Sequence, residues 1–159
     1  MGRQLARRLN ARFYDSDQVI EQRVGCSIRD YFELEGEAAF RDLEEAVINE
    51  LTGHTACVLS TGGGSVLRQA NRDNLRRHTR TVYLHSSPDE IFRRLRHDKS
   101  RPLLQVPDPL ARLHELYAVR DPLYRQTAHF VVDTGRPSVF ILAGEILRQL
   151  EQAGVLSPP

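Results

Sequence analysis

Three short apolar runs, separated by longer amphipathic segments, most strongly constrain how this chain can fold. The runs are Ala56–Ser60, Thr81–His85 and His129–Asp133. Continuous apolar runs of this length are typical of strands that are buried on both faces of a parallel sheet. A further short strand is expected at Arg12–Tyr14. Because helical spacing fills the segments between the runs, the sequence predicts an α/β fold in which helices cover a parallel sheet.

The helices are expected where apolar residues recur at intervals of three or four. The expected ranges are 3–9, 17–24, 27–32, 37–51, 70–77, 88–96, 110–127 and 138–152. Asp17 is a candidate N-cap for the helix after the first strand, because a carboxylate can accept from the free N–H groups there. Pro122 is expected to end or kink its helix, since proline lacks the N–H donor. The polar stretch 98–110 is expected to be a loop.

Composition narrows the class of protein. The 159 residues fit one domain, covering residues 1–159. The 22 basic and 21 acidic residues leave a net charge of +1, which argues against bulk nucleic-acid binding. No apolar run approaches the roughly 18 residues of a membrane span, and no signal peptide is recognisable, so we expect a cytoplasmic protein. Cys26 and Cys57 fit no metal-binding spacing.

Polar clusters follow three of the expected strands, at the sheet edge where such folds bind ligands. Asp15 and Asp17 follow the first strand and could face a metal-phosphate site and a substrate hydroxyl. They could equally be a helix cap and a solvated neighbour. Gly62–Gly64 follow Ala56–Ser60, and such a run lets the backbone approach a ligand closely, or else forms a simple turn. Arg136 lies just beyond the last strand.

Three further arginines are candidates for binding an anion. Arg41 and Glu44 lie three apart on one helix, so Glu44 could fix Arg41 for an anionic ligand. The alternative is a surface ion pair worth roughly 0.3–0.5 kcal/mol. Arg101 lies in the 98–110 loop, which could close over phosphates or could be a plain surface loop. Arg120 lies just before Pro122.

Together these segments resemble the shikimate kinases, especially the proteobacterial ones. The matching stretches are Gly2–Ala6, Phe13–Asp17, Gly36–Arg41, Thr61–Val66, Arg101–Leu104 and Arg120–Tyr124, all in the family's order. Each stretch is weak alone, but their order along nearly the whole chain is specific. A related small-molecule kinase, such as a gluconate kinase, is an alternative, although the acid pair with the three glycines favours shikimate.

The resemblance implies a three-layer P-loop kinase fold, similar to nucleoside monophosphate kinases. It implies a monomer that uses ATP and Mg²⁺ to phosphorylate the 3-hydroxyl of shikimate, in chorismate and aromatic amino acid biosynthesis. It also implies residue roles. Asp17 and Arg101 are expected to be catalytic; Asp17, Arg41, Gly62, Gly63, Gly64 and Arg120 to bind shikimate; Arg101 and Arg136 to bind ATP; and Asp15 to organise Mg²⁺.

One feature of the family is not found in these residues. The phosphate-binding pattern G-x-x-x-x-G-K-[ST] does not occur, and the lone Lys99 lies in the 98–110 loop. Met1 is followed at once by Gly2–Ala6, which the family places just after that loop. We therefore expect an N-terminally truncated chain that lacks the first, central strand, is unstable and has no measurable kinase activity. A non-catalytic shikimate-binding remnant is the alternative.

Overall fold

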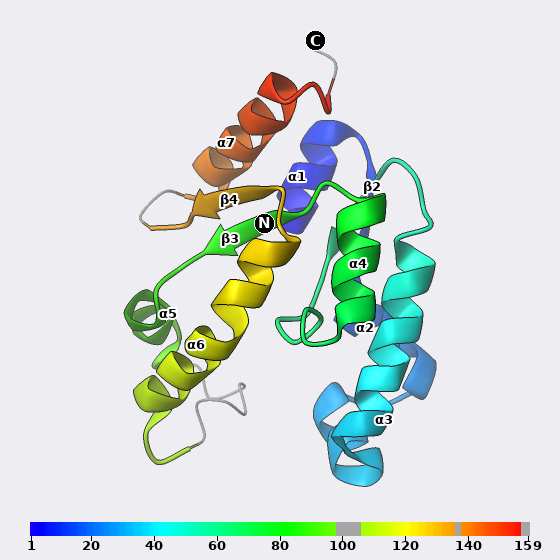
Figure 1. Cartoon of the computed structure of the whole chain (residues 1–159), viewed down its shortest axis with the longest axis vertical. Coiled ribbons are helices and arrows are strands. Elements are labelled where there is room, and N and C mark those ends of the chain that lie inside the picture. The colour runs from blue at the N-terminus through cyan, green and yellow to red at the C-terminus, as the bar shows by residue number, and fades with distance from the viewer. Residues whose placement is uncertain (98–105, 136–137, 157–159) are drawn as a thin grey trace.

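A computed structural model describes residues 1–97, 106–135 and 138–156 (Figure 1). Strands and helices alternate as the apolar runs predict, and all four expected strands are present. The elements are α1 Gly2–Leu9, β1 Arg12–Asp15, α2 Ser16–Val24, α3 Ile28–Leu51, β2 Cys57–Ser60, α4 Gln69–His78, β3 Val82–His85, α5 Pro88–Leu95, α6 Pro109–Thr127, β4 Phe130–Asp133 and α7 Val139–Gln152. Most of the expected 98–110 loop lies outside the described residues, and α6 begins at Pro109.

The strands pair in parallel, as expected for an α/β fold, but they form two separate sheets. β1 pairs with β2, with Asp15 opposite Ser60 at their carboxyl ends. β3 pairs with β4, with His85 opposite Asp133 at the same end. Within the described residues β2 and β3 are not hydrogen-bonded to each other. The predicted parallel sheet is therefore present as two pairs, and contacts between helices contribute to joining them.

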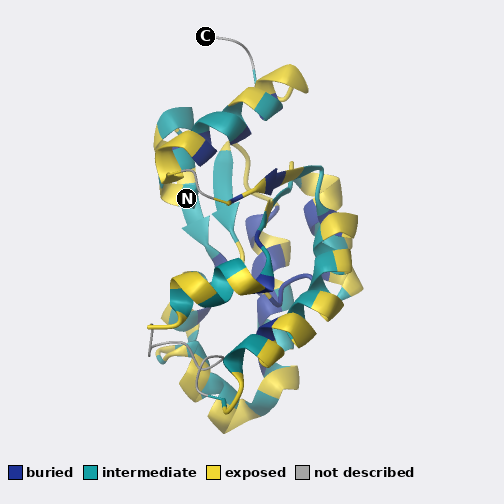
Figure 2. Cartoon of the chain, turned by 90° about the vertical axis from the view of Figure 1, so that its left-hand side faces the viewer, coloured by how far each residue is buried: buried dark blue, intermediate teal, exposed yellow. Residues whose placement is uncertain are grey.

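Two apolar clusters hold the helices against these sheets. The first lies between α2 and α3, on the side of β1 and β2, and the second lies between β4 and α7. Their buried members are Ile20, Phe40, Val47 and Leu51 in the first cluster, and Val132, Leu142, Ile146 and Leu150 in the second. Figure 2 shows buried segments on the inner side of the helices, while the outer sides are exposed. None of the described helices is long and apolar enough to cross a membrane.

The N-cap of α2 corrects the sequence prediction. The cap is Asp15 and not Asp17, because Asp15 has the extended backbone of a capping residue, with φ −112° and ψ 117°. Its Oδ1 accepts hydrogen bonds from the backbone N–H of Asp17 at 3.0 Å and of Gln18 at 3.2 Å. Asp17 instead lies in the first turn of the helix, so its own carboxylate is not committed to capping.

Two of the predicted helices are joined, and a third runs through a proline. α3 spans Ile28–Leu51 but is kinked at Gly36, where φ is 84° and ψ is 171°, so the two helices that the sequence predicts lie on either side of this glycine. α6 agrees with the predicted range 110–127, and of the two effects expected of Pro122 an end of the helix is wrong, because the helix continues to Thr127. Side chains anchor α6 on both sides of the proline, because Tyr117 bonds to His85 at 2.7 Å and Tyr124 to the carbonyl of Gly63 at 2.6 Å.

Candidate functional site

The glycine turn, Gly62–Gly64, leaves the carboxyl end of β2 beside the end of β1. Hydrogen bonds fix the residues that follow it. The hydroxyl of Ser65 donates to the carbonyl of Gly62 at 2.7 Å, and Ser65 is buried. Arg72 of α4 donates to the carbonyl groups of Val66 at 2.8 Å and of Leu67 at 3.1 Å. These bonds fix the backbone of the segment that follows the turn, so that side chains from other elements can pack against the turn in a defined arrangement.

Each glycine of the turn lies against a different charged side chain. A Cβ on Gly62 would lie 2.8 Å from Oδ1 of Asp17, one on Gly63 would lie 3.2 Å from Nη1 of Arg120, and one on Gly64 would lie 2.7 Å from Cζ of Arg41. The three charged residues come from α2, α6 and α3. The structure thus brings one carboxylate and two guanidinium groups together around the turn, and all three belong to the residues expected to bind shikimate.

Arg41 is held by a buried carboxylate. Its Nη1 lies 2.8 Å from Oε1 of Glu44, and the two side chains are only 12% and 2% exposed. Glu37 lies farther away, 3.6 Å from Nε of Arg41. The alternative of a surface ion pair is therefore wrong, because Glu44 is fully packed. The buried Nε of Arg41 has no hydrogen-bond partner among the described residues, so the guanidinium retains a donor for another anion.

The carboxyl group of Asp17 has a raised pKa. Its pKa is raised to about 6, chiefly by burial and then by the neighbouring carboxylates of Asp15, Glu44 and Glu21, against the lowering effect of Arg41. A carboxylate whose pKa lies near neutrality can both accept and release a proton at physiological pH. Asp17 therefore has the chemistry of a general base, with the guanidinium of Arg41 close enough to act on it.

Tyr124 is a site residue that sequence reasoning missed. Its hydroxyl donates to the carbonyl of Gly63 at 2.6 Å, and it lies one helical turn beyond Arg120 on α6. Burial raises the pKa of this hydroxyl, although the guanidinium of Arg120 beside it acts in the opposite direction. The signal that could have revealed it is the spacing of four between Arg120 and Tyr124, which places both on one helix face.

Other predicted positions are not brought into this group. Arg101 and Arg136 lie outside the described residues. The described part of the chain contains no cluster of three or more His, Cys, Asp or Glu side chains suited to a metal. Mg²⁺ in phosphate-transfer sites needs only one or two carboxylates, because water and phosphate oxygens complete its shell. Asp15 and Asp17 fit that requirement, although Oδ1 of Asp15 already serves as the N-cap of α2.

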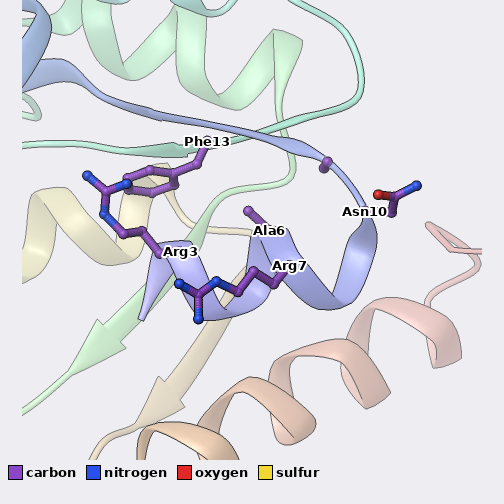
Figure 3. Close-up of a pocket in the computed structure, with 6 residues that line it drawn as sticks. Arg3, Ala6, Arg7, Asn10 and Phe13 are labelled. Carbon is purple, nitrogen blue, oxygen red and sulfur yellow. The ribbon is translucent and has the colours of Figure 1, made fainter.

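A separate cavity of about 420 Å³ lies between α1 and β1 (Figure 3). Arg3, Arg7, Asn10 and Phe13 contribute to its lining. Arg3 lies over the ring of Phe13, with its Cζ 4.8 Å from the ring centroid. The cavity shares no residue with the group around the glycine turn.

Comparisons with known proteins agree on one family. The sequence model of the family described as "Shikimate kinase" matches residues 1–151. The chain is 52% identical to the shikimate kinase of Ralstonia nicotianae, covering 100% of this chain and 84% of that protein. It is 58% identical to the shikimate kinase of Paracidovorax citrulli, covering 99% and 88%.

Solved structures agree in fold. A shikimate kinase from Acinetobacter baumannii in complex with shikimate superposes with a TM-score of 0.92 and 41% identity, covering 98% of this chain and 87% of that one. A shikimate kinase from Bacteroides thetaiotaomicron gives a TM-score of 0.85 and 31% identity, covering 98% and 90%.

Proposed function

The chain belongs to the shikimate kinase family, and we propose that it transfers a phosphoryl group from ATP to the 3-hydroxyl of shikimate. One observation carries the substrate half of this proposal: Asp17, Arg41 and Arg120 each lie against a different glycine of one turn. Charges of both signs, held close together at a strand end, suit a small ligand that carries a carboxylate and hydroxyl groups.

The chemistry of shikimate matches these groups. Shikimate is a ring carboxylate with three hydroxyl groups. Arg41 and Arg120 are the residues to bind its carboxylate, since guanidinium forks form charge-assisted bonds with carboxylates. Asp17 is the residue to accept hydrogen bonds from the ring hydroxyls and to take the proton of the attacking one, for which a pKa of about 6 is suitable.

The phosphate half of the proposal depends on the family. Phosphoryl transfer requires mainly positioning and neutralisation of charge on the transferred group. We assign Arg101 and Arg136 to ATP, and Asp15 to Mg²⁺, on the resemblance alone. The metal, when bound, would neutralise charge on the phosphates. On the same basis we propose a cytoplasmic monomer that acts in chorismate and aromatic amino acid biosynthesis.

Calorimetric titration of the 159-residue chain with shikimate, and separately with gluconate, tests the substrate half. We expect saturable heat with shikimate and none with gluconate. The Arg41→Ala variant should lose the signal. Arg29→Ala is the matched control, because Arg29 lies on the same helix but is 67% exposed and pairs only with Glu33 among the described residues. Absence of shikimate binding, or equal binding of gluconate, would overturn the assignment.

Incubation with Mg²⁺, ATP and shikimate, followed by ³¹P NMR, tests the transfer step. Shikimate 3-phosphate is the product that the proposal requires of the enzyme. Its formation by residues 1–159 would confirm the transfer and refute the expectation that these residues by themselves show no turnover, whereas its absence would agree with that expectation.

A further inference from the structure

Tyr124 connects the two halves of the substrate site. Asp17 and Arg41 belong to helices that pack on the side of β1 and β2, whereas Arg120 lies on α6, which contacts β3. The two sheets are not hydrogen-bonded to each other within the described residues. The hydroxyl of Tyr124 crosses between the halves, since it donates from α6 to the carbonyl of Gly63 after β2. Contacts of α4 with α3 and with α6 also join the halves, but the Tyr124 hydroxyl is a link at the glycine turn itself, where both arginines lie.

The ring of Tyr124 is fixed by its neighbours. It packs against the ring of Tyr83 on β3, with centroids 4.9 Å apart. The hydroxyl of Tyr83 donates to Asp121 at 2.8 Å, and Asp121 also accepts from Nε of Arg125 at 3.0 Å. The side chain of Tyr124 is thus held in place on α6, and its hydroxyl constrains the position of the Gly63 carbonyl.

The hydroxyl also lies beside Arg120. The position of a Cβ on Gly63 would be 3.2 Å from both the hydroxyl of Tyr124 and Nη1 of Arg120. A tyrosine hydroxyl has one hydrogen, and here the Gly63 carbonyl receives it. The oxygen lone pairs thus remain to accept from the neighbouring guanidinium. Burial raises the pKa of this hydroxyl, which keeps it protonated and able to donate.

We propose that Tyr124 is a positioning residue, whose hydroxyl holds Arg120 and the Gly63 backbone in the relative arrangement that receives the substrate carboxylate and ring. This inference rests on the proposed function for the identity of the substrate. Tyr124 need not touch the substrate, because its effect passes through Arg120 and Gly63.

The Tyr124→Phe variant, which keeps the ring and removes only the hydroxyl, tests this role. A single hydrogen bond corresponds to about a 2- to 12-fold change in an equilibrium constant. We expect shikimate affinity to fall by about 3- to 10-fold in calorimetric titration. Tyr117→Phe is the matched control, because it removes another tyrosine hydroxyl from α6, one that bonds to His85 at 2.7 Å and not to the turn. This control should keep wild-type affinity.

Two further measurements distinguish positioning from general stability. In an Arg120→Ala background, Tyr124→Phe should weaken shikimate binding by less than about 2-fold, because the group through which it acts is gone.

In the free chain, hydrogen exchange over residues 61–66 should be faster in Tyr124→Phe than in wild type or Tyr117→Phe. That second measurement needs no ligand. It decides the role of Tyr124 in holding the turn even if wild type fails to bind shikimate, an outcome that would refute the proposed function alone. Unchanged exchange at the turn, or equal affinity losses in the two tyrosine variants, would overturn the inference.

Discussion

A methyl group on Gly64 would overlap the guanidinium of Arg41, so the Gly64→Ala substitution tests the geometry of the site directly. The new Cβ would lie 2.7 Å from Cζ of Arg41, closer than non-bonded carbon atoms approach in folded proteins. The guanidinium has little freedom to retreat, because it is 12% exposed and lies 2.8 Å from the buried carboxylate of Glu44. Either Arg41 must leave Glu44 or the glycine turn must shift.

The cost follows from the bond that must break. A hydrogen bond to a charged group contributes about 1.5–3 kcal/mol, and Glu44 is too buried for water to replace Arg41 easily. In a domain of this size, 1 kcal/mol changes the melting temperature by about 2–4 °C. Gly64→Ala should therefore lower Tm by about 3–12 °C. Displacement of Arg41 should also weaken shikimate binding by about 10- to 100-fold, because a charge-assisted contact to the carboxylate is lost.

Thermal unfolding followed by circular dichroism, together with calorimetric titration with shikimate, measures both effects. Gly144→Ala is the control, because a Cβ there meets only Nη1 of Arg8 at an ordinary 3.4 Å. Gly144 lies inside α7, where alanine is favoured over glycine by about 0.5–1 kcal/mol, so the control should be slightly stabilised. If Gly64→Ala keeps the wild-type Tm and affinity, the guanidinium of Arg41 does not pack against Gly64, and the description of the site is wrong.

Substitutions at three positions of the site, Asp17, Arg41 and Asp15, have defined outcomes. The raised pKa of Asp17 means that the folded chain binds this proton more tightly than the unfolded chain, so its ionisation lowers stability as pH rises from about 4 to 6. Asp17→Asn should remove that loss and raise the free energy of unfolding at pH 7 by about 1 kcal/mol, after allowance for partial exposure. The same substitution should weaken shikimate binding. Urea denaturation at pH 4.5 and at pH 7 measures the change in stability. Arg41→Ala leaves Glu44 buried without its partner and should cost about 3–5 kcal/mol in the same assay at pH 7. Asp15→Ala should cost about 1 kcal/mol through loss of the N-cap, whereas Asp15→Asn should retain it in thermal unfolding.

The sequence predicts the strands well because their signal is local. Each apolar run is continuous and is bounded by polar or turn-forming residues, so little outside the run can change its assignment. The cap of α2 was misassigned because Asp15 and Asp17 are both good capping residues, and only the backbone conformation of Asp15 decides between them. α6 continues through Pro122, and contacts with residues distant in sequence, which no local pattern reveals, anchor it on both sides of the proline.

The site is predictable only as a set of residue types. Asp17, Arg41 and Arg120 stand out by their places beside strand ends, a helix start and a proline. The burial of Glu44 could not be read from the sequence, because a spacing of three is equally common for surface ion pairs. The spacing of four from Arg120 places Tyr124 on the same helix face, but its partner cannot be predicted, because a backbone carbonyl 61 residues away carries no sequence signature.

The glycine turn shows how local and distant constraints differ. A turn commonly needs glycine where φ is positive, but the described glycines with positive φ are Gly25, Gly36 and Gly154. Gly62–Gly64 are therefore not required by their own backbone conformation. Space favours glycine instead, because a Cβ would lie 2.8 Å from Oδ1 of Asp17 at Gly62 and 2.7 Å from Cζ of Arg41 at Gly64, with a tight 3.2 Å contact to Arg120 at Gly63. Close approach between the turn and its own neighbours, and not backbone freedom, is the physical reason for three successive glycines at this strand end.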